Sequence, residues 1–527
     1  MMKSTEIGTA DKGVAITSAR TQVVWFKRDL RTFDNICLVQ AAARGPVFAM
    51  LVIEPRYWQL PETSWRQFEA QRQAIQSLQE QLASIGGKLN IWTGDAVNAL
   101  RAIHGRVKSF DLWAHQETGN YWTFQRDNAV RAWCCEHDIL FTEPVQYGVW
   151  RGSRLNRDRW AKDWDALMTK PLLEQPSSLH WFGEVLEGFV DKLLTAEKLG
   201  LKAEGIIGLQ PCGRDAALAT LRSFLYQRGR NYSTDMSSPR LGAMGCSRMS
   251  VHIATGSISM RECYQATLRR IAESEGDNSE DARAWRASLK SFIGRLHWHC
   301  HFMQKLETEP EMEFRPVARV YEGMRPAVLP EWHEAFAQGR TGFPFIDACM
   351  RSLIATGWIN FRMRAMLMSF ACYDLFMPWQ EAGTILGRLF TDYEPGIHWT
   401  QSQMQSGETG INTLRIYSPV KQGRDHDPDG RFIRQWVPEL KHLTGDVLHE
   451  PWMHGGVDGY PEPLVDHTTA AQSARDAIWT IRRTDEAKAE AAHVLLRHGS
   501  RRRPRARGKS AFTKGASKKL KTKKVDI

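Results

Sequence analysis

Short apolar runs recur through the first 150 residues, and they predict buried strands. The runs stand at 22–26, 47–53, 88–92, 111–114 and 139–141. Between the second and third runs, apolar residues recur at helical spacing after Ser64, a suitable capping residue: Trp65, Phe68, Ile75, Leu78 and Leu82. A second helix is predicted at 124–136. Because strands that alternate with helices indicate βαβ units, we expect a parallel sheet over 21–150.

Further along the chain the strand pattern stops and helical periodicity takes over. Helices are predicted at 214–228, 259–275, 282–305, 345–356, 359–375 and 378–389. We therefore expect an α/β N-terminal, Rossmann-like parallel-sheet domain over 21–150 and an all-helical domain over 216–480. Residues 151–215 are expected to be an interdomain linker. The polar ends, a lead over 1–20 and a basic tail over 481–527, are expected to be disordered.

The net charge of +11 is concentrated at one end of the chain. Twelve of the 70 Lys and Arg residues and one of the 59 acids lie in 501–527, so the rest is formally neutral. Such a basic segment attracts polyanions, and salt-sensitive phosphate contacts are one role for it. A solubilising or targeting tail is the equally weighted alternative.

Composition narrows the class of protein. A hydrophobic fraction of 42% and a charged fraction of 24% are ordinary for a soluble globular chain. The nine cysteines form no CxxC pair, which fits a reducing compartment. No signal peptide is apparent, and no apolar run is long enough to cross a membrane. We expect a cytoplasmic, monomeric protein without membrane contacts. The α/β part has no GxGxxG or Walker loop, so nothing points to an ordinary dinucleotide or ATP site.

Five ordered sequence blocks carry the specific chemistry. They are Val23–Asn35, Gly245–Ser259, Thr356–Leu375 with Pro378–Glu381, Thr391–Trp399, and Arg415–Leu440. The second block places small hydroxyl residues and backbone N–H groups at a helix start, an arrangement that suits a pyrophosphate. Together the blocks resemble the class I photolyases and cryptochromes, as a divergent bacterial-type member. With Tyr460–His467, the resemblance covers roughly residues 22–480.

The resemblance implies a blue-light flavoprotein whose helical domain holds FAD. It assigns FAD contacts to Tyr232, Cys246, Ser247, Arg248, Met249, Ser250, Phe292, Arg362, Arg364 and Asp392, with an ion pair between the last two. Cys246 stands where the family usually has Thr. Arg28, Asp29 and Arg31 match positions that tie the first loop to the helical domain. A second antenna chromophore (a folate, a deazaflavin or a flavin) or none at all is left open.

Aromatic residues would carry electrons to the flavin. Trp379 matches the middle member of the family's tryptophan chain, and Trp399 is a candidate for the flavin-proximal member, although a core role is equally expected for it. Tyr321 is the candidate for the outer member. Gly396 is the best match for the residue that faces flavin N5.

The expected substrate pocket departs from the family pattern. Its residues are Arg295, Trp298, His299, Phe302 and Phe361. Trp298 keeps the base-stacking aromatic, whereas Arg295 replaces the glutamate that hydrogen-bonds the lesion, and a cation accepts no hydrogen bond. The run of His297, His299, Cys300 and His301 suggests a metal site, but only His297 and His301 share a helix face. We expect no metal.

Three functions fit this sequence. The first is a DNA photolyase that repairs pyrimidine dimers by photoinduced electron transfer from reduced FAD, with damaged DNA, including single-stranded DNA, as its partner. The alternative is a cryptochrome-type blue-light photoreceptor without repair activity. The third, an α/β electron-transfer protein, accounts for the first domain but not for the later blocks.

Overall fold

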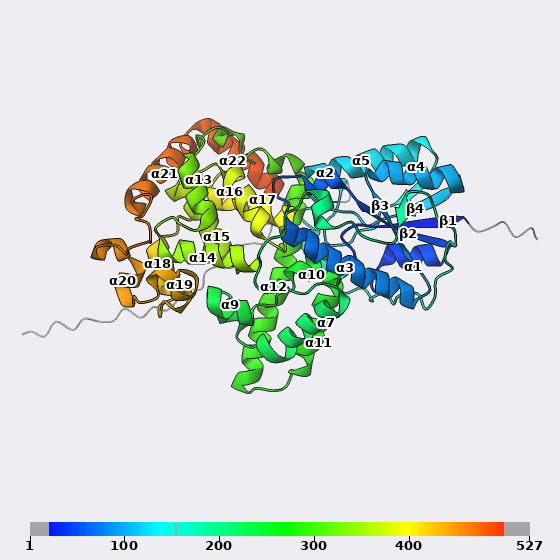
Figure 1. The fold of residues 1–527 in the computed structure, drawn as a ribbon, viewed down its shortest axis with the longest axis horizontal. Coiled ribbons are helices and arrows are strands. Elements are labelled where there is room, and N and C mark those ends of the chain that lie inside the picture. Colours follow the sequence, from blue (N-terminus) through cyan, green and yellow to red (C-terminus); the bar gives the residue numbers. More distant parts are fainter. Residues whose placement is uncertain (1–19, 153–154, 500–527) are drawn as a thin grey trace, which may run out of the picture.

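The computed structural model describes residues 20–152 and 155–499, and its first part is built on a six-stranded sheet (Figure 1). The strand order is β5-β4-β1-β2-β3-β6. All five predicted strands are confirmed to within one residue, and they pair in parallel: β1 (Thr21–Phe26), β2 (Val47–Ile53), β3 (Leu89–Thr93), β4 (Phe110–Trp113) and β5 (Leu140–Thr142).

Both faces of the sheet are covered by helices, because successive side chains of a strand point to opposite faces. In β1, Val24 and Phe26 join a core with α1 (Ile36–Ala42) and α3 (Trp65–Ser84). Val23 and Trp25 join the other core, with α4 (Ala96–Val107) and α5 (Tyr121–Glu136). A strand buried on both sides reads as a continuous apolar run, which is why the pattern located it.

The segment expected to be a linker contributes to the sheet. Residues 151–215 contain α6 (Trp160–Met168) and the two-residue strand β6 (Phe189–Val190), which pairs antiparallel with β3. Gly188 precedes β6 with a φ of +83°, and a Cβ there would lie 2.4 Å from the ring of Trp92. A strand this short leaves no periodic signal, so the pattern could not reveal the return of the chain to the sheet.

The second part is helical, as predicted. The helices that build it are α7 (Arg214–Ser223), α8 (Tyr232–Asp235), α9 (Pro239–Gly245), α10 (Ser250–Thr255), α11 (Met260–Glu273), α12 (Glu280–Thr308), α13 (Pro330–Gln338), α14 (Pro344–Thr356), α15 (Phe361–Ser369), α16 (Trp379–Leu389), α17 (Pro395–Ser406), α18 (Pro419–His426), α19 (Arg431–Trp436), α20 (Gly445–His449), α21 (His467–Arg482) and α22 (Asp485–His498). The helices predicted at 214–228 and 359–375 each end in a π-helical stretch, Phe224–Arg228 and Phe370–Asp374.

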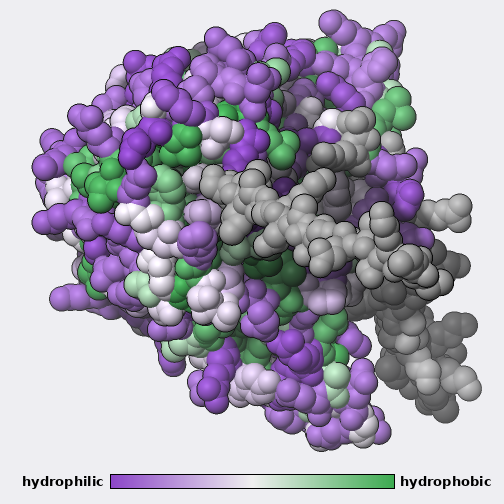
Figure 2. Space-filling view, turned by 90° about the vertical axis from the view of Figure 1, so that its right-hand side faces the viewer, coloured by the Kyte–Doolittle hydropathy of each residue, from purple (hydrophilic) through white to green (hydrophobic). Residues whose placement is uncertain are grey.

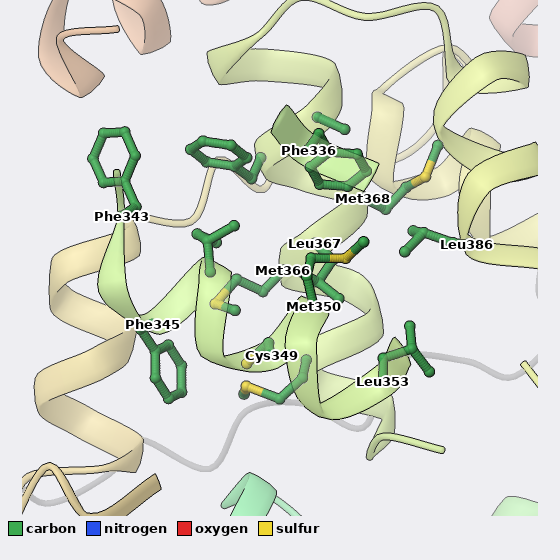
Figure 3. Close-up of a cluster of buried hydrophobic side chains, with 14 of the residues drawn as sticks. Phe336, Phe343, Phe345, Cys349, Met350, Leu353, Met366, Leu367, Met368 and Leu386 are labelled. Atoms are coloured by element: carbon green, nitrogen blue, oxygen red, sulfur yellow. The ribbon is translucent and has the colours of Figure 1, made fainter. Parts of the chain in front are cut away.

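The core of the helical part surrounds α14 and α15. Figure 3 shows Cys349, Met350 and Leu353 of α14 packed near Met366 and Leu367 of α15. Met368 and Leu386, at the margin of the same cluster, also line a large cavity, so the core and the cavity wall are continuous. The face of the molecule shown in Figure 2 is mostly hydrophilic, with hydrophobic residues in separate patches.

The expected tail over 481–527 is wrong in its first part. Residues 485–498 form α22, whose N-terminus is capped by the Thr484 hydroxyl. Glu490 accepts hydrogen bonds from the backbone N–H groups of Arg319 and Val320, and His498 pairs with Glu309 at 2.6 Å. These contacts, with helix-forming Ala, Glu and Leu residues, give this polar stretch a fixed place. Residues 500–527, and residues 1–19 of the expected lead over 1–20, lie outside the described residues.

The loop after β1 joins the two parts of the molecule. Arg28 donates to both carboxylate oxygens of Glu394 at 3.0 Å and, through Nε, to the Ala254 carbonyl at 2.9 Å. Arg31 donates to the Gly256 carbonyl. Asp29 was expected to contact the helical part as well. Its carboxylate instead accepts hydrogen bonds within the α/β part, from Lys27, Asn35 and His115. In the described ranges, no helix combines the length and apolar character that a bilayer crossing requires.

Replacing Arg28 with Ala is expected to destabilise the protein by about 3–5 kcal/mol, because it leaves a buried carboxylate without its cation. Burial already raises the pKa of Glu394 to about 7, so the loss should grow as the pH rises and the stranded group ionises. Urea denaturation at several pH values measures the effect. Arg72→Ala, which breaks the partly exposed Arg72–Glu69 pair, is the matched control and should cost less than about 1 kcal/mol. Equal losses in the two variants would contradict the prediction.

Candidate functional site

A cavity of about 540 Å³ lies among α8, α10, α12, α15 and α17. This volume is typical of sites that take a large organic ligand. The residues assigned to FAD all line it: Tyr232, Cys246, Ser247, Arg248, Met249, Ser250, Phe292, Arg362, Arg364 and Asp392. The residues assigned to the substrate line it as well: Arg295, Trp298, His299, Phe302 and Phe361. Segments far apart in the sequence therefore meet at one place.

The turn at 247–250 presents backbone donors to the cavity. Arg248 adopts a left-handed conformation, with a φ of +59°, just before α10 begins at Ser250. No side chain caps α10, so the N–H groups of its first turn are available to an anionic group. Ser247 Oγ accepts a hydrogen bond from the Met249 N–H at 3.4 Å, which keeps the turn closed.

Two arginines hold this turn in place. Arg228, which the sequence did not single out, donates to the Ser247 carbonyl at 2.6 Å and also to the Cys246 carbonyl. The Arg248 guanidinium lies 4.2 Å from the centre of the Trp358 ring, and its Nε donates to Gln210 Oε1. Burial lowers the pKa of Arg248 to about 10, which leaves it a cation at neutral pH. The turn thus combines backbone donors with positive charge, as a pyrophosphate requires.

The predicted ion pair between Arg364 and Asp392 is confirmed. Arg364 Nη2 lies 2.9 Å from Asp392 Oδ2, and its guanidinium lies 4.1 Å from the centre of the Phe390 ring. The other oxygen, Asp392 Oδ1, is buried without a hydrogen-bond partner, like Asn360 Oδ1 and Gln405 Oε1 in the same lining. Buried acceptors without partners are costly unless a ligand supplies donors. The ring N–H and ribityl hydroxyls of FAD are such donors, so these residues fit the cofactor.

The mouth of the cavity is aromatic. Trp298 stacks on Phe302, one turn along α12, with ring centroids 5.4 Å apart and planes at 29°. Trp298 is 42% exposed and Phe361, at the start of α15, is 44% exposed. Arg295, which is also exposed, has its guanidinium 5.7 Å from the centre of the Phe361 ring. A flat ring could therefore enter and stack without displacing the core.

Histidines in and near the cavity are buried in neutral form. Burial lowers the pKa of His299 and His301 to about 3, and that of His252 and His398 to about 4. His398 Nε2 donates to the Gly383 carbonyl at 2.8 Å, which leaves its Nδ1 as an acceptor. His297 packs against the rings of Trp160 and Trp164. Among the described residues, no group of three His, Cys, Asp or Glu side chains could hold a metal ion.

Trp379 and Trp399 lie behind the cavity wall. Their ring centroids are 5.8 Å apart at an interplanar angle of 75°, and neither ring lines the cavity. His398 lines the cavity, and the centre of its ring is 4.9 Å from that of Trp399. Tyr321 belongs to a different buried cluster from Trp379. Gly396 does not line the cavity either; a Cβ there would lie 2.7 Å from Met303 Cα, so this glycine permits close packing of α17 on α12.

A second, smaller cavity lies at the carboxyl ends of β1 and β2. Its volume is about 80 Å³, and charged side chains occupy its walls, among them Lys27, Glu54 and Arg126. Arg126 pairs with Glu54 at 3.0 Å and with Glu117 at 2.6 Å. This volume is below the roughly 300 Å³ at which pockets for large organic ligands begin, whereas the cavity in the helical part lies within their range.

The buried histidines predict acid sensitivity. A histidine whose folded pKa lies below its ordinary value of 6.5 binds its proton only on unfolding, so stability should fall as the pH drops from 6.5 toward 4. Each such histidine contributes about 1.4 kcal/mol per pH unit in that window. His398→Gln should reduce the slope of the unfolding free energy against pH by about one such contribution. His454→Gln, at an exposed position, should leave this slope unchanged. Urea denaturation across this pH range measures both, and identical slopes would contradict the prediction.

Comparisons with known proteins agree with this site. A family model described as DNA photolyase matches residues 22–151, and one described as the FAD binding domain of DNA photolyase matches 292–480. A deoxyribodipyrimidine photo-lyase of Escherichia coli (strain K12) is 28% identical over 485 residues, which cover 85% of this chain and 96% of the relative. Cryptochrome-2 of Arabidopsis thaliana is 27% identical, over 88% of this chain and 79% of its own.

A solved structure shows the same fold. The Synechocystis sp. PCC6803 cryptochrome superposes with a TM-score of 0.77 at 22% identity, over 87% of this chain and 99% of that one. The two matched family models lie on the sheet and on the helical part that surrounds the cavity. The predicted fold class is therefore confirmed, with a mostly parallel sheet followed by a helical FAD-binding domain. The chain belongs to the photolyase/cryptochrome family.

Proposed function

We propose that the protein is a light-driven DNA repair enzyme that acts on pyrimidine dimers. The observation that carries the proposal is the single cavity with two kinds of lining: the FAD-binding residues inside, and the exposed aromatic pair Trp298 and Phe361 at the mouth. A damaged base that leaves its stack could enter past these rings and reach van der Waals distance of the cofactor. Relatives of both names, a photo-lyase and a cryptochrome, align with most of this chain, so the choice between their functions has to be argued from the cavity.

The FAD-binding roles are proposed from the resemblance and from the position of these residues in the cavity lining. Backbone N–H groups of 247–250, with Arg248, would hold the pyrophosphate. Tyr232 and Phe292 would pack against the dinucleotide, and Arg362, Arg364 and Asp392 would lie along the ring system. When bound, FAD supplies a light-excitable one-electron donor and acceptor. The Arg364 cation near that ring favours added negative charge, and the apolar wall from Met368 to Leu386 limits the access of water.

The DNA partner is proposed to bind across the mouth, where unpaired bases of damaged or single-stranded DNA are accessible. Trp298 and Phe302 offer a stacking face of the kind that single-strand binders use. The basic segment 501–527 would add salt-dependent phosphate contacts. It begins beyond α22, whose His498 is held at Glu309, just past the end of α12. The last described turn of α22 thus lies beside the C-terminal end of the helix that carries Trp298.

The cryptochrome-type photoreceptor is the second candidate, and one observation favours it. Arg295 occupies the position at which the repair enzymes of the family carry a carboxylate for the lesion. If the mouth does not bind DNA lesions, light-driven reduction of FAD would instead change the conformation of a surface to which a partner protein binds. The chain's organisation serves both functions: an α/β domain over 21–150, the segment 151–215, and a helical domain over 216–480.

Illumination of the FAD-loaded, reduced protein with an oligothymidylate that contains cyclobutane dimers is expected to restore the monomeric thymines. Loss of dimers is followed by chromatography, with a dark sample as the control. If the dimers survive while the bound FAD is still reduced by light, the photoreceptor replaces the repair enzyme as the proposed function.

Trp379→Phe is expected to lose most of the light-driven reduction of oxidised FAD, because Trp379 is the partner of Trp399 and is placed to pass an electron inward. FAD binding and the repair of dimers by chemically reduced protein should remain. Reduction is followed by the flavin absorption under blue light with an external reductant. Trp479→Phe, a substitution of a tryptophan that is 43% exposed on α21, is the control. Unchanged photoreduction in Trp379→Phe would exclude this route.

A further inference from the structure

The mouth of the cavity carries cations and no uncommitted carboxylate. Of the described residues that line the cavity, only Asp392 and Glu394 are acidic. Asp392 is paired with Arg364 at 2.9 Å, and Glu394 is held by Arg28 at 3.0 Å. Both pairs lie on the inner side, where the segment leading into α17 meets α15 and the loop after β1. The exposed charged side chains of the lining are Arg295 on α12, Arg362 on α15 and Arg415 in the segment before α18.

Arg295 is held in position by neutral groups. Its Nη2 lies 3.6 Å from Met236 Sδ, its guanidinium faces the Phe361 ring, and the Tyr232 hydroxyl lies beside it. It takes part in none of the ion pairs among the described residues. A guanidinium has five donors and no acceptor, so an arginine placed in this way retains donors for a ligand.

The helix geometry fixes what this arginine would contact. Arg295 and Trp298 are three residues apart on α12, so their side chains share one face of the helix. A pyrimidine ring that stacks on Trp298 would turn its edge toward Arg295. That edge has two carbonyl oxygens on either side of an imide N–H. A carboxylate would accept from the N–H, whereas the arginine donates to the carbonyl oxygens, as arginine does when it reads base-edge acceptors in DNA.

We infer that Arg295 is a specificity-determining residue that recognises the carbonyl oxygens of an unstacked pyrimidine lesion stacked on Trp298. The inference rests on the proposed DNA-directed function and deepens it. In this arrangement the Arg295 guanidinium donates hydrogen bonds to the carbonyl oxygens, whereas a carboxylate at the same position would accept one from the imide N–H. Phe361 and Met236 position the guanidinium, so that little side-chain entropy is lost on binding.

The test measures binding in the dark with the full-length, FAD-loaded protein. The probes are a short fluorescent oligothymidylate with one cyclobutane thymine dimer and the same strand without damage. Arg295→Gln is expected to lower the affinity for the dimer strand roughly 10-fold or more, the usual cost of a lost hydrogen bond from a charged donor. Affinity for the undamaged strand should stay nearly constant. Arg295→Lys, which keeps the charge but not the planar fork, should keep only part of the preference.

Control variants distinguish recognition of the lesion by Arg295 from a general effect of surface charge or a loss of the cofactor. Arg240→Gln removes an equivalent exposed charge from α9, outside the cavity lining, and should not change the preference for the dimer strand. FAD content reports whether each variant keeps its site. If Arg295→Gln loses FAD, Phe361→Leu takes its place, because it removes the ring beside the guanidinium and should reduce the preference by a smaller factor.

Three results would overturn the inference. One is an unchanged dimer preference in Arg295→Gln. A second is an equal loss for both strands with a salt dependence that is weaker by about one phosphate contact, which would make Arg295 a backbone contact. The third is a wild-type protein with no preference for the dimer strand. Intact dimer binding without repair under light would instead refute the proposed repair function and leave the role of Arg295 standing.

Discussion

The buried contact between Arg28 and Glu394 is the constraint on which the site depends. One guanidinium, from the loop after β1, binds the carboxylate just before α17 and the Ala254 carbonyl near the end of α10. Helices α10 and α17 form facing parts of the cavity wall. Their separation is therefore fixed by a residue of the α/β domain. Because both charges are largely buried, breaking the pair is costly, and this cost holds α10 and α17 at their present positions.

A second constraint acts where α17 meets α12. Gly396 lets the α17 backbone approach Met303, since any side chain there would collide with the α12 backbone. Gly383 does the same for Trp399, whose ring occupies the space of a Cβ. His398 lines the cavity and contacts the Trp399 ring, and burial keeps it neutral. This neighbour of the tryptophan pair therefore adds no charge of its own.

The sequence predicted the parts of the structure that repeat or that form long patterns. The five parallel strands were found because residues such as Val24 and Trp25 are buried on opposite faces of one strand. Strand β6, two residues long, and α22, polar and anchored by Glu490, were missed because their places depend on distant partners. The residues proposed to bind FAD were assigned by resemblance. Asn360, Gln405 and Arg228 were not assigned, because their roles become visible only in the folded chain. Asn360 and Gln405 have buried side-chain oxygens without hydrogen-bond partners, and Arg228 donates to the Ser247 carbonyl of the turn.

The charges at the mouth explain why family membership alone leaves the function open. The interior is nearly balanced, because each carboxylate of the lining is already bound by an arginine. At the mouth, Arg295 and Arg362 have no such partners among the ion pairs of the described chain, so the potential there is positive. A polyanion is attracted to such a mouth whatever its sequence. Discrimination between a damaged base and other nucleotides must then come from close contacts with Trp298 and Arg295. Stacking on Trp298 fixes the plane of the base, and the donors of Arg295 select the edge that it presents. In this chain the residues proposed to bind the base and those proposed to bind the cofactor are separate sets, so a substitution at the mouth can change substrate choice while the cofactor contacts remain.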